Sequence, residues 1–185
     1  MRIIGGTHKG TKILESFDKN TRPLKDLVKE SILNILEHSK DSRIELKKSL
    51  ILDLFSGTGS FGLECLSRGS KKIYFIEKDN FSYNILKKNI KLTQMENKSV
   101  CFNLDVNTFL KKNKKKFDII FFDPPFKSFD FLDIIRVIKK FLMYKENNLV
   151  IIHRDTKIKD TFPDCIKIFK TSIYGRSKVI FGTII

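Results

Sequence analysis

The chain has 185 residues, and its 36 lysines and arginines outnumber its 21 aspartates and glutamates, so the formal net charge is +15. This length suits one α/β domain with a small addition, and no apolar run is long enough to span a membrane. The charge favours a nucleic-acid partner, because Lys and Arg replace phosphate counterions, although a lysine-rich composition produces the same balance.

The N-terminal forty residues predict a small appendage. Residues 1–16 contain two short β-like pieces separated by glycines, which is typical of a hairpin. Residues 21–39 have apolar side chains at helical spacing, with Lys and Glu on the other face and Pro23 near the start. We expect residues 1–40 to face RNA and residues 41–185 to form the main domain.

From residue 49 onward, strands alternate with helices. The strand-like runs are 49–55, 71–77, 99–105, 117–123 and 147–154. The helical runs are 59–69, 80–94, 106–112 and 130–143. Residues 165–175 and 177–185 predict a closing hairpin around Gly175 that adds the only antiparallel strand. This order predicts an α/β fold with a Rossmann-like, mostly parallel sheet that is covered on both faces.

Other features of the sequence exclude several classes of site. The first ten residues lack the apolar core of a signal peptide, so we expect a cytoplasmic protein with no membrane partner, present as a monomer. The cysteines and histidines are scattered and form no C-x-x-C motif. We therefore predict no metal site and interpret the thiols as structural.

Residues 56–62 read SGTGSFG, in which Gly57, Gly59 and Gly62 match the G-x-G-x-x-G spacing of dinucleotide-binding loops. Glycines directly after a strand let the backbone approach a ligand closely. Glu77 ends the second strand and can accept both hydroxyls of a ribose. By these features alone, a dinucleotide and S-adenosylmethionine (SAM) fit equally well.

Three further features favour SAM. Asp53 ends the first strand, where it would repel a pyrophosphate but attract an ammonium and a sulfonium. Asp105 ends the third strand and can accept from an adenine amine. The fourth strand ends in DPPF, residues 123–126, which nicotinamide enzymes do not need there. Asp53 or Glu77 alone could be a solvated strand end or a helix cap, but the occurrence of acids at consecutive strand ends favours SAM.

The DPPF motif suits a planar ring that has an amino group. Pro124 and Pro125 supply no N–H and keep the preceding residue out of the helical region, so nearby carbonyls stay free to accept. Asp123 and the carbonyl of Pro124 can accept the two amine hydrogens, and Phe126 can stack on the ring. A rigid strand-to-loop turn is the alternative interpretation.

A base inside a stacked helix cannot enter such a pocket, so the target must be flipped out or lie in a loop. Basic residues near the site are needed to hold the flanking backbone, although a solvated surface explains each of them singly. The candidates for RNA binding are Arg2, Lys9, Lys12, Arg22, Lys25, Lys29, Arg176 and Lys178.

With these motifs the chain resembles the RsmD-type 16S rRNA guanine-N2 methyltransferases over nearly its whole length. The matching stretches are MRIIGGTHKGTKI, TRPLKDLVKESILNIL, LDLFSGTGSFGLECLSRGS, FFDPPF and YGRSKV. The resemblance implies a class I methyltransferase fold, SAM as the cofactor, and transfer to guanine N2 at the position called 966 in that family. The chain departs from the family at Leu24-Lys25, where Thr-Thr or Thr-Ser is frequent.

The motifs and the resemblance together define the expected site. The catalytic residues are Asp123, Pro124, Pro125 and Phe126. The cofactor-binding residues are Asp53, Phe55, Ser56, Gly57, Thr58, Gly59, Glu77, Lys78, Asp105, Val106 and Asp123. Three alternatives remain: an adenine-N6 methyltransferase, a methyltransferase acting on a glutamine amide, and a SAM-binding RNA assembly factor without turnover. The 16S rRNA substrate is either naked or part of an assembled small subunit.

Overall fold

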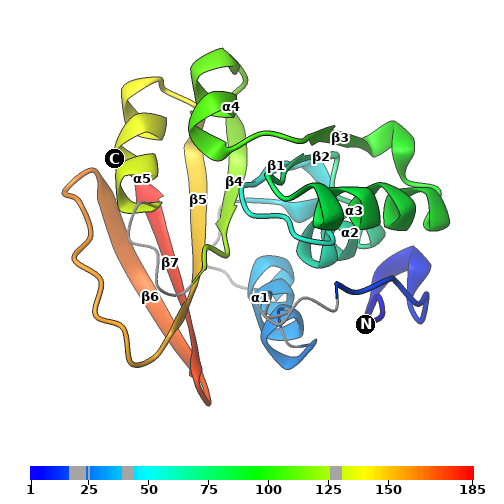
Figure 1. The fold of residues 1–185 in the computed structure, drawn as a ribbon. Coiled ribbons are helices and arrows are strands. Elements are labelled where there is room, and N and C mark those ends of the chain that lie inside the picture. The colour runs from blue at the N-terminus through cyan, green and yellow to red at the C-terminus, as the bar shows by residue number, and fades with distance from the viewer. Residues whose placement is uncertain (17–23, 25, 39–43, 126–130) are drawn as a thin grey trace.

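The computed structural model describes residues 1–16, 24, 26–38, 44–125 and 131–185. One seven-stranded sheet has the order β3-β2-β1-β4-β5-β7-β6 (Figure 1). Its strands are β1 (Leu50–Asp53), β2 (Lys72–Ile76), β3 (Ser99–Phe102), β4 (Phe117–Phe122), β5 (Tyr144–Asp155), β6 (Ile166–Tyr174) and β7 (Ser177–Ile184). Strands β1 to β5 pair in parallel, and β7 pairs antiparallel with both β5 and β6. The predicted sheet with one antiparallel strand is confirmed.

Helices cover both faces of the sheet. They are α1 (Asp26–His38), α2 (Ser60–Ser67), α3 (Asn80–Leu92), α4 (Val106–Lys112) and α5 (Phe131–Lys140), with 3-10 turns at Gly6–His8, Leu46–Lys48 and Glu96–Lys98. Buried side chains of α1, α2 and α3 belong to one hydrophobic cluster, and those of α4 and α5 belong to the other. Among the described residues, no helix is long and apolar enough to cross a membrane.

The two clusters arise because neighbouring side chains of a strand point to opposite faces. In β1, Ile51 enters the first cluster and Leu52 the second, and both are fully buried. On the first face the rings of Phe61 and Phe121 stack with their centroids 3.8 Å apart. The central strands are therefore apolar on both sides, which explains their continuous hydrophobic runs.

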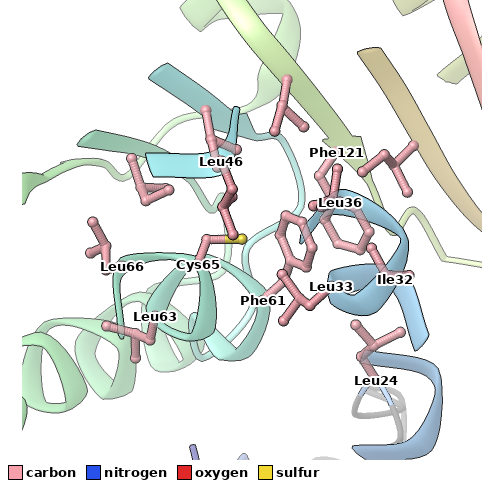
Figure 2. Packing of buried hydrophobic residues seen from close by; sticks show 14 of the residues in the cluster. Leu24, Ile32, Leu33, Leu36, Leu46, Phe61, Leu63, Cys65, Leu66 and Phe121 are labelled. Carbon is pink, nitrogen blue, oxygen red and sulfur yellow. The ribbon is translucent and has the colours of Figure 1, made fainter. Parts of the chain in front are cut away.

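Helix α1 packs against α2 instead of standing apart from the main domain. Leu33 and Leu36 of α1 lie beside Phe61 of α2 and Leu46 in the same cluster (Figure 2). The N-terminal segment also contributes Ile3, which is buried there. The described residues between 1 and 38 thus share one core with the sheet, and the RNA-facing role of residues 1–40 remains a prediction.

Glu64, fully buried on α2, fastens the N-terminal segment to that helix. Its carboxylate accepts hydrogen bonds from the N–H groups of Ile4 and Gly5, at 2.7 Å each. The predicted hairpin is short: it has one antiparallel bridge, between Arg2 and Lys12, with backbone hydrogen bonds from Ile3 to Thr11 and from Ile13 to Met1 at 3.0 Å each.

Candidate active site

The carboxyl ends of the parallel strands meet at one edge of the sheet. The chain connects β1 to β2 on one side, while β4 pairs with β1 on the other, so the strand order reverses between β1 and β4. Ligands of open α/β sheets bind at such a switch point. The loop after β1, the end of β2 and the turn after β4 all lie at this edge.

Asp53, at the end of β1, is 1% exposed, and neither of its carboxylate oxygens has a hydrogen bond of normal geometry. Burial raises the pKa of Asp53 well above its ordinary value, and the charges of Asp123 and Glu77 raise it further. The N–H groups of Gly62 and Phe55 lower this pKa, but less than burial raises it. A buried carboxylate without compensation suits a cationic ligand and would repel a pyrophosphate.

The glycines of the SGTGSFG loop serve different purposes. Gly57 has a φ of +52°, and a Cβ added to it would meet nothing within 4 Å. A Cβ on Gly62 would lie 2.2 Å from the ring of Phe75. Gly57 is therefore the position where the backbone is open to a ligand, whereas Gly62 is needed for close packing of α2 on β2.

Hydrogen bonds hold this loop from both sides. The hydroxyl of Ser56 donates to the carbonyl of Asp53 at 2.8 Å and accepts from the N–H of Ile76 at 2.9 Å. Asn89 of α3 donates its amide to the carbonyl of Thr58 at 2.9 Å. The predicted cofactor residue Ser56 is buried, and its side chain joins β1 to β2.

Glu77 follows β2 and also supports the loop. Its carboxylate accepts from the N–H of Gly57 at 2.7 Å and from the N–H of Asp79 at 2.8 Å. Burial raises the pKa of Glu77, and these two N–H groups lower it in part. Each carboxylate oxygen has a second lone pair, so Glu77 can still accept from a ribose hydroxyl. The neighbouring Lys78 is exposed.

Asp105 caps α4 and is exposed. Its carboxylate accepts from the N–H of Thr108 at 3.0 Å and from the hydroxyl of the same residue. These hydrogen bonds lower the pKa of Asp105. Asp105 is therefore the N-cap of α4, and its remaining lone pairs are available to a ligand. Val106 is the buried first residue of the helix.

Asp123, directly after β4, keeps 20% of its side chain exposed and lies at the same edge. Its Oδ1 is 2.8 Å from Nδ1 of His153, near the end of β5. Pro124 is buried and Pro125 exposed. Phe126 lies outside the described residues, so its stacking on a target ring remains a prediction.

The sequence interpretation missed His153 and the adjacent Arg154. Both are buried, with 3% and 0% of their surfaces exposed. Arg154 donates through Nη1 to the carbonyl of Pro125 at 3.4 Å. The available signal was two polar residues at the carboxyl end of an apolar strand, next in the sheet to the DPPF strand.

The predicted RNA-binding residues fall into three groups: those that are exposed, those outside the described residues, and those held by internal acceptors. Arg2, Lys9 and Lys12 are exposed on the N-terminal segment, and 69% of the Arg176 side chain is exposed beside the turn between β6 and β7. Arg22 and Lys25 lie outside the described residues.

Two of the predicted contacts need correction. Lys29 is fully buried, and its Nζ donates to the carbonyl of Arg2 at 3.1 Å and lies 3.6 Å from Glu64. Lys178 donates to the carbonyl of Ile158 and lies 3.6 Å from Asp160, with 15% of its side chain exposed. Both ammonium groups are held by internal acceptors, which removes Lys29 from any RNA-binding surface and directs Lys178 inward.

Within the described ranges, no three His, Cys, Asp or Glu side chains gather in a way that could hold a metal ion. The buried, uncompensated Asp53 fits an organic cation such as SAM. Asp123 adds a partly exposed carboxylate at the same edge, whereas the carbonyl of Pro125 accepts from Arg154. The arrangement can therefore hold a cationic group beside a hydrogen-bond donor such as an amine.

Comparison with known proteins shows which family and which folds the chain is similar to. A family model described as conserved hypothetical protein 95 matches residues 1–183. Ribosomal RNA small subunit methyltransferase D of Buchnera aphidicola subsp. Baizongia pistaciae is 33% identical over 160 residues, 85% of this chain and 78% of that protein. The solved structure of Escherichia coli yhhF has a TM-score of 0.84 at 23% identity, covering 98% of this chain and 96% of that one. Haemophilus influenzae HI0767 gives 0.76 at 28% identity, with coverage of 98% and 96%.

Proposed function

Because the chain belongs to the conserved hypothetical protein 95 family, the RsmD-type methyltransferases, and has a class I methyltransferase fold, we propose that it methylates ribosomal RNA using SAM. The observation that carries the proposal is the buried carboxylate of Asp53, whose oxygens have no hydrogen bond of normal geometry and which lies at the same sheet edge as Asp123. An uncompensated negative charge calls for a positive ligand there. An rRNA substrate would make this a cytoplasmic activity.

Three acids would hold the cofactor. Asp53 would attract its positive charge, Glu77 would accept from the ribose hydroxyls, and Asp105 would accept from the adenine amine. When bound, SAM supplies an electrophilic methyl group on a sulfonium. The backbone at Gly57, open on its Cβ side, would let the ligand approach closely.

We propose that the acceptor is the exocyclic N2 of a guanine. Asp123 and the carbonyl of Pro124 would each accept one amine hydrogen, which makes the nitrogen lone pair more available and orients it. Orientation of this kind contributes a large part of the rate of a displacement reaction. Asp123 would also take the proton that the nitrogen must lose, and His153 would keep its carboxylate in position.

The target in small-subunit rRNA, at the position called 966 in the family, is the finer part of the proposal. It is supported by the family and by the name of the Buchnera relative. An adenine-N6 methyltransferase remains the second candidate, because the same acceptors suit that amine. The exposed Arg2, Lys9, Lys12 and Arg176 would hold the RNA backbone beside the flipped base.

The test is nucleoside mass spectrometry of 16S rRNA from a strain that lacks this chain. We expect the loss of one N2-methylguanine, its return with the wild-type chain, and no return with Asp123→Ala. The variant should still bind SAM. Unchanged rRNA would refute the proposal, and loss of N6-methyladenine would favour the second candidate. Rescue of the strain by Asp123→Ala without methylation would indicate an assembly factor.

A further inference from the structure

Arg154 is a fully buried arginine on β5 that forms a fork with a buried carboxylate. Its Nη2 and Nε lie 3.0 and 3.2 Å from Oδ1 of Asp160, and Nε lies 3.3 Å from Oδ2. Neither side chain has exposed surface. Lys178 of β7 lies 3.6 Å from the same carboxylate, so the group joins β5, β7 and the loop that follows β5.

The turn of residues 123–125 is called here the catalytic turn, because it carries the proposed catalytic residues. The guanidinium of Arg154 contacts the last residue of this turn and also the first residue of α5. Its Nη1 donates to the carbonyl of Pro125 at 3.4 Å. Its central carbon lies 4.7 Å from the ring centroid of Phe131, the first residue of α5. Pro125 and Phe131 stand on either side of residues 126–130. One side chain thus contacts both Pro125 and Phe131.

The turn itself has few backbone donors with which to hold its shape. Pro124 and Pro125 have no N–H, so neither can donate a backbone hydrogen bond that would hold the turn. A donor from another element is therefore needed, and Arg154 supplies one. Its planar guanidinium can bind a carboxylate and a carbonyl in fixed directions at once, which an ammonium cannot do.

We propose that Arg154 is a positioning residue for the catalytic turn, and that Asp160 holds its guanidinium in the orientation this requires. By fixing Pro125, Arg154 sets the direction of the Pro124 carbonyl and of the Asp123 carboxylate that precedes it. The proposal rests on the proposed function, because it assigns Arg154 a purpose in methyl transfer. The competing explanation is that the pair stabilises the fold and nothing more.

Buried ion pairs offer a way to separate the two explanations. Removing one partner leaves an uncompensated charge, whereas replacing both with apolar side chains is often neutral for stability. Arg154→Met should lower the melting temperature by about 5–10 °C. The double variant Arg154→Met/Asp160→Leu should regain most of this loss, because Lys178 loses Asp160 but keeps the carbonyl of Ile158 as an acceptor and reaches solvent with part of its side chain. If Arg154 acts on the turn, the double variant should still have kcat reduced by about 100-fold.

The experiment compares wild type, both variants and Arg154→Lys, which keeps the charge and loses the fork. Arg68→Met is the matched control, since Arg68 is also an ion-paired, largely buried arginine but pairs with Glu64 and Glu37. Melting temperature, SAM affinity and kcat on 16S rRNA are measured for each. We expect unchanged SAM affinity throughout, a kcat loss in all three Arg154 variants, and unchanged kcat in the control.

Hydrogen exchange provides a readout that needs no substrate. In the double variant, amides in peptides covering 118–125 and 131–138 should exchange about tenfold faster than in wild type, although the melting temperature is restored. Unchanged exchange there, or recovery of kcat together with the melting temperature, would overturn the assignment. Absence of methyl transfer by the wild-type chain would instead count against the proposed function. The exchange result would still decide whether Arg154 holds the turn in place.

Discussion

The imidazole Nδ1 of His153 lies 2.8 Å from Oδ1 of Asp123, joining the end of β5 to the residue that follows β4. A donor at this distance restricts the carboxylate to one rotamer. We predict that His153→Leu, which fills space but cannot donate, lowers kcat by about 10- to 100-fold without changing SAM affinity. Single-turnover methylation and calorimetric SAM titration would measure the two quantities separately.

His153→Asn is the matched control for this prediction, because its amide nitrogen can occupy the place of Nδ1 and donate to Asp123. It should retain kcat within about tenfold of wild type. Equal activity of His153→Leu and wild type would remove His153 from the mechanism. Equal loss in both variants would point to imidazole chemistry that an amide cannot provide.

A second prediction concerns pH, because burial raises the pKa of Asp53. The folded protein holds this proton more tightly than the unfolded chain, where the pKa is about 3.9. Between that value and the higher folded pKa, the folded state binds more protons, so the free energy of unfolding falls as pH rises. At pH values above the folded-state pKa of Asp53, its carboxylate is ionised, and the buried charge lowers the free energy of unfolding by its full amount.

Asp53→Asn should therefore stabilise the ligand-free protein at neutral pH by about 1–3 kcal/mol, with little gain below pH 4. It should also weaken SAM binding by tenfold or more, since about 1.4 kcal/mol of lost attraction has that effect. Urea denaturation of wild type and Asp53→Asn from pH 4 to 8 gives the difference in their free energies of unfolding. The contribution of Glu77, whose pKa is also raised, is common to both proteins and cancels in this difference. A wild-type chain as stable as the variant at neutral pH would contradict the argument.

Two glycines of the same loop should respond differently to alanine. At Gly62 the new Cβ would lie 2.2 Å from Phe75, so we expect a loss of about 1–3 kcal/mol of stability and nearly normal SAM affinity. At Gly57 the Cβ enters open space but the φ of +52° is strained, at a cost of about 1–2 kcal/mol. SAM affinity should fall only for Gly57→Ala. Denaturation and titration of both variants would show whether the loop contacts the ligand there.

Local patterns predict most of the fold and the part of the site that lies on consecutive residues. The alternating strands, the glycine loop and DPPF are all written within short stretches, so their order along the chain is enough to place them. His153 and Arg154 could not be assigned in this way. Their importance depends on the pairing of β4 with β5, which brings residues about thirty positions apart into contact.

Lys29 illustrates the opposite error. Lys29 precedes Leu33 and Leu36 by four and seven residues, so helical spacing places it on the apolar face of α1, although a lysine usually meets solvent. Here Glu64 on α2 is buried against that face, and Lys29 pairs with it at 3.6 Å. The RNA contact was predicted from the charge of Lys29 rather than from its spacing, and no pattern within α1 shows that α2 supplies a buried carboxylate to pair with it.

The last prediction separates structural from RNA-binding lysines. Lys29→Met removes hydrogen bonds to the carbonyl of Arg2 and the hydroxyl of Ser60, so it should cost about 1–3 kcal/mol of stability. RNA affinity and its salt dependence should not change. Lys12→Met, at an exposed position, should alter stability by less than about 0.5 kcal/mol.

The salt dependence of RNA binding gives the sharper measurement. Each phosphate contact contributes about 0.7–0.9 to the slope of log affinity against log salt concentration, so Lys12→Met should reduce the slope by nearly one. Fluorescence anisotropy with a 16S rRNA fragment at several salt concentrations would determine it. A reduced slope in Lys29→Met would mean that the buried ammonium becomes exposed when RNA binds, because only a group that reaches a phosphate releases its counterion.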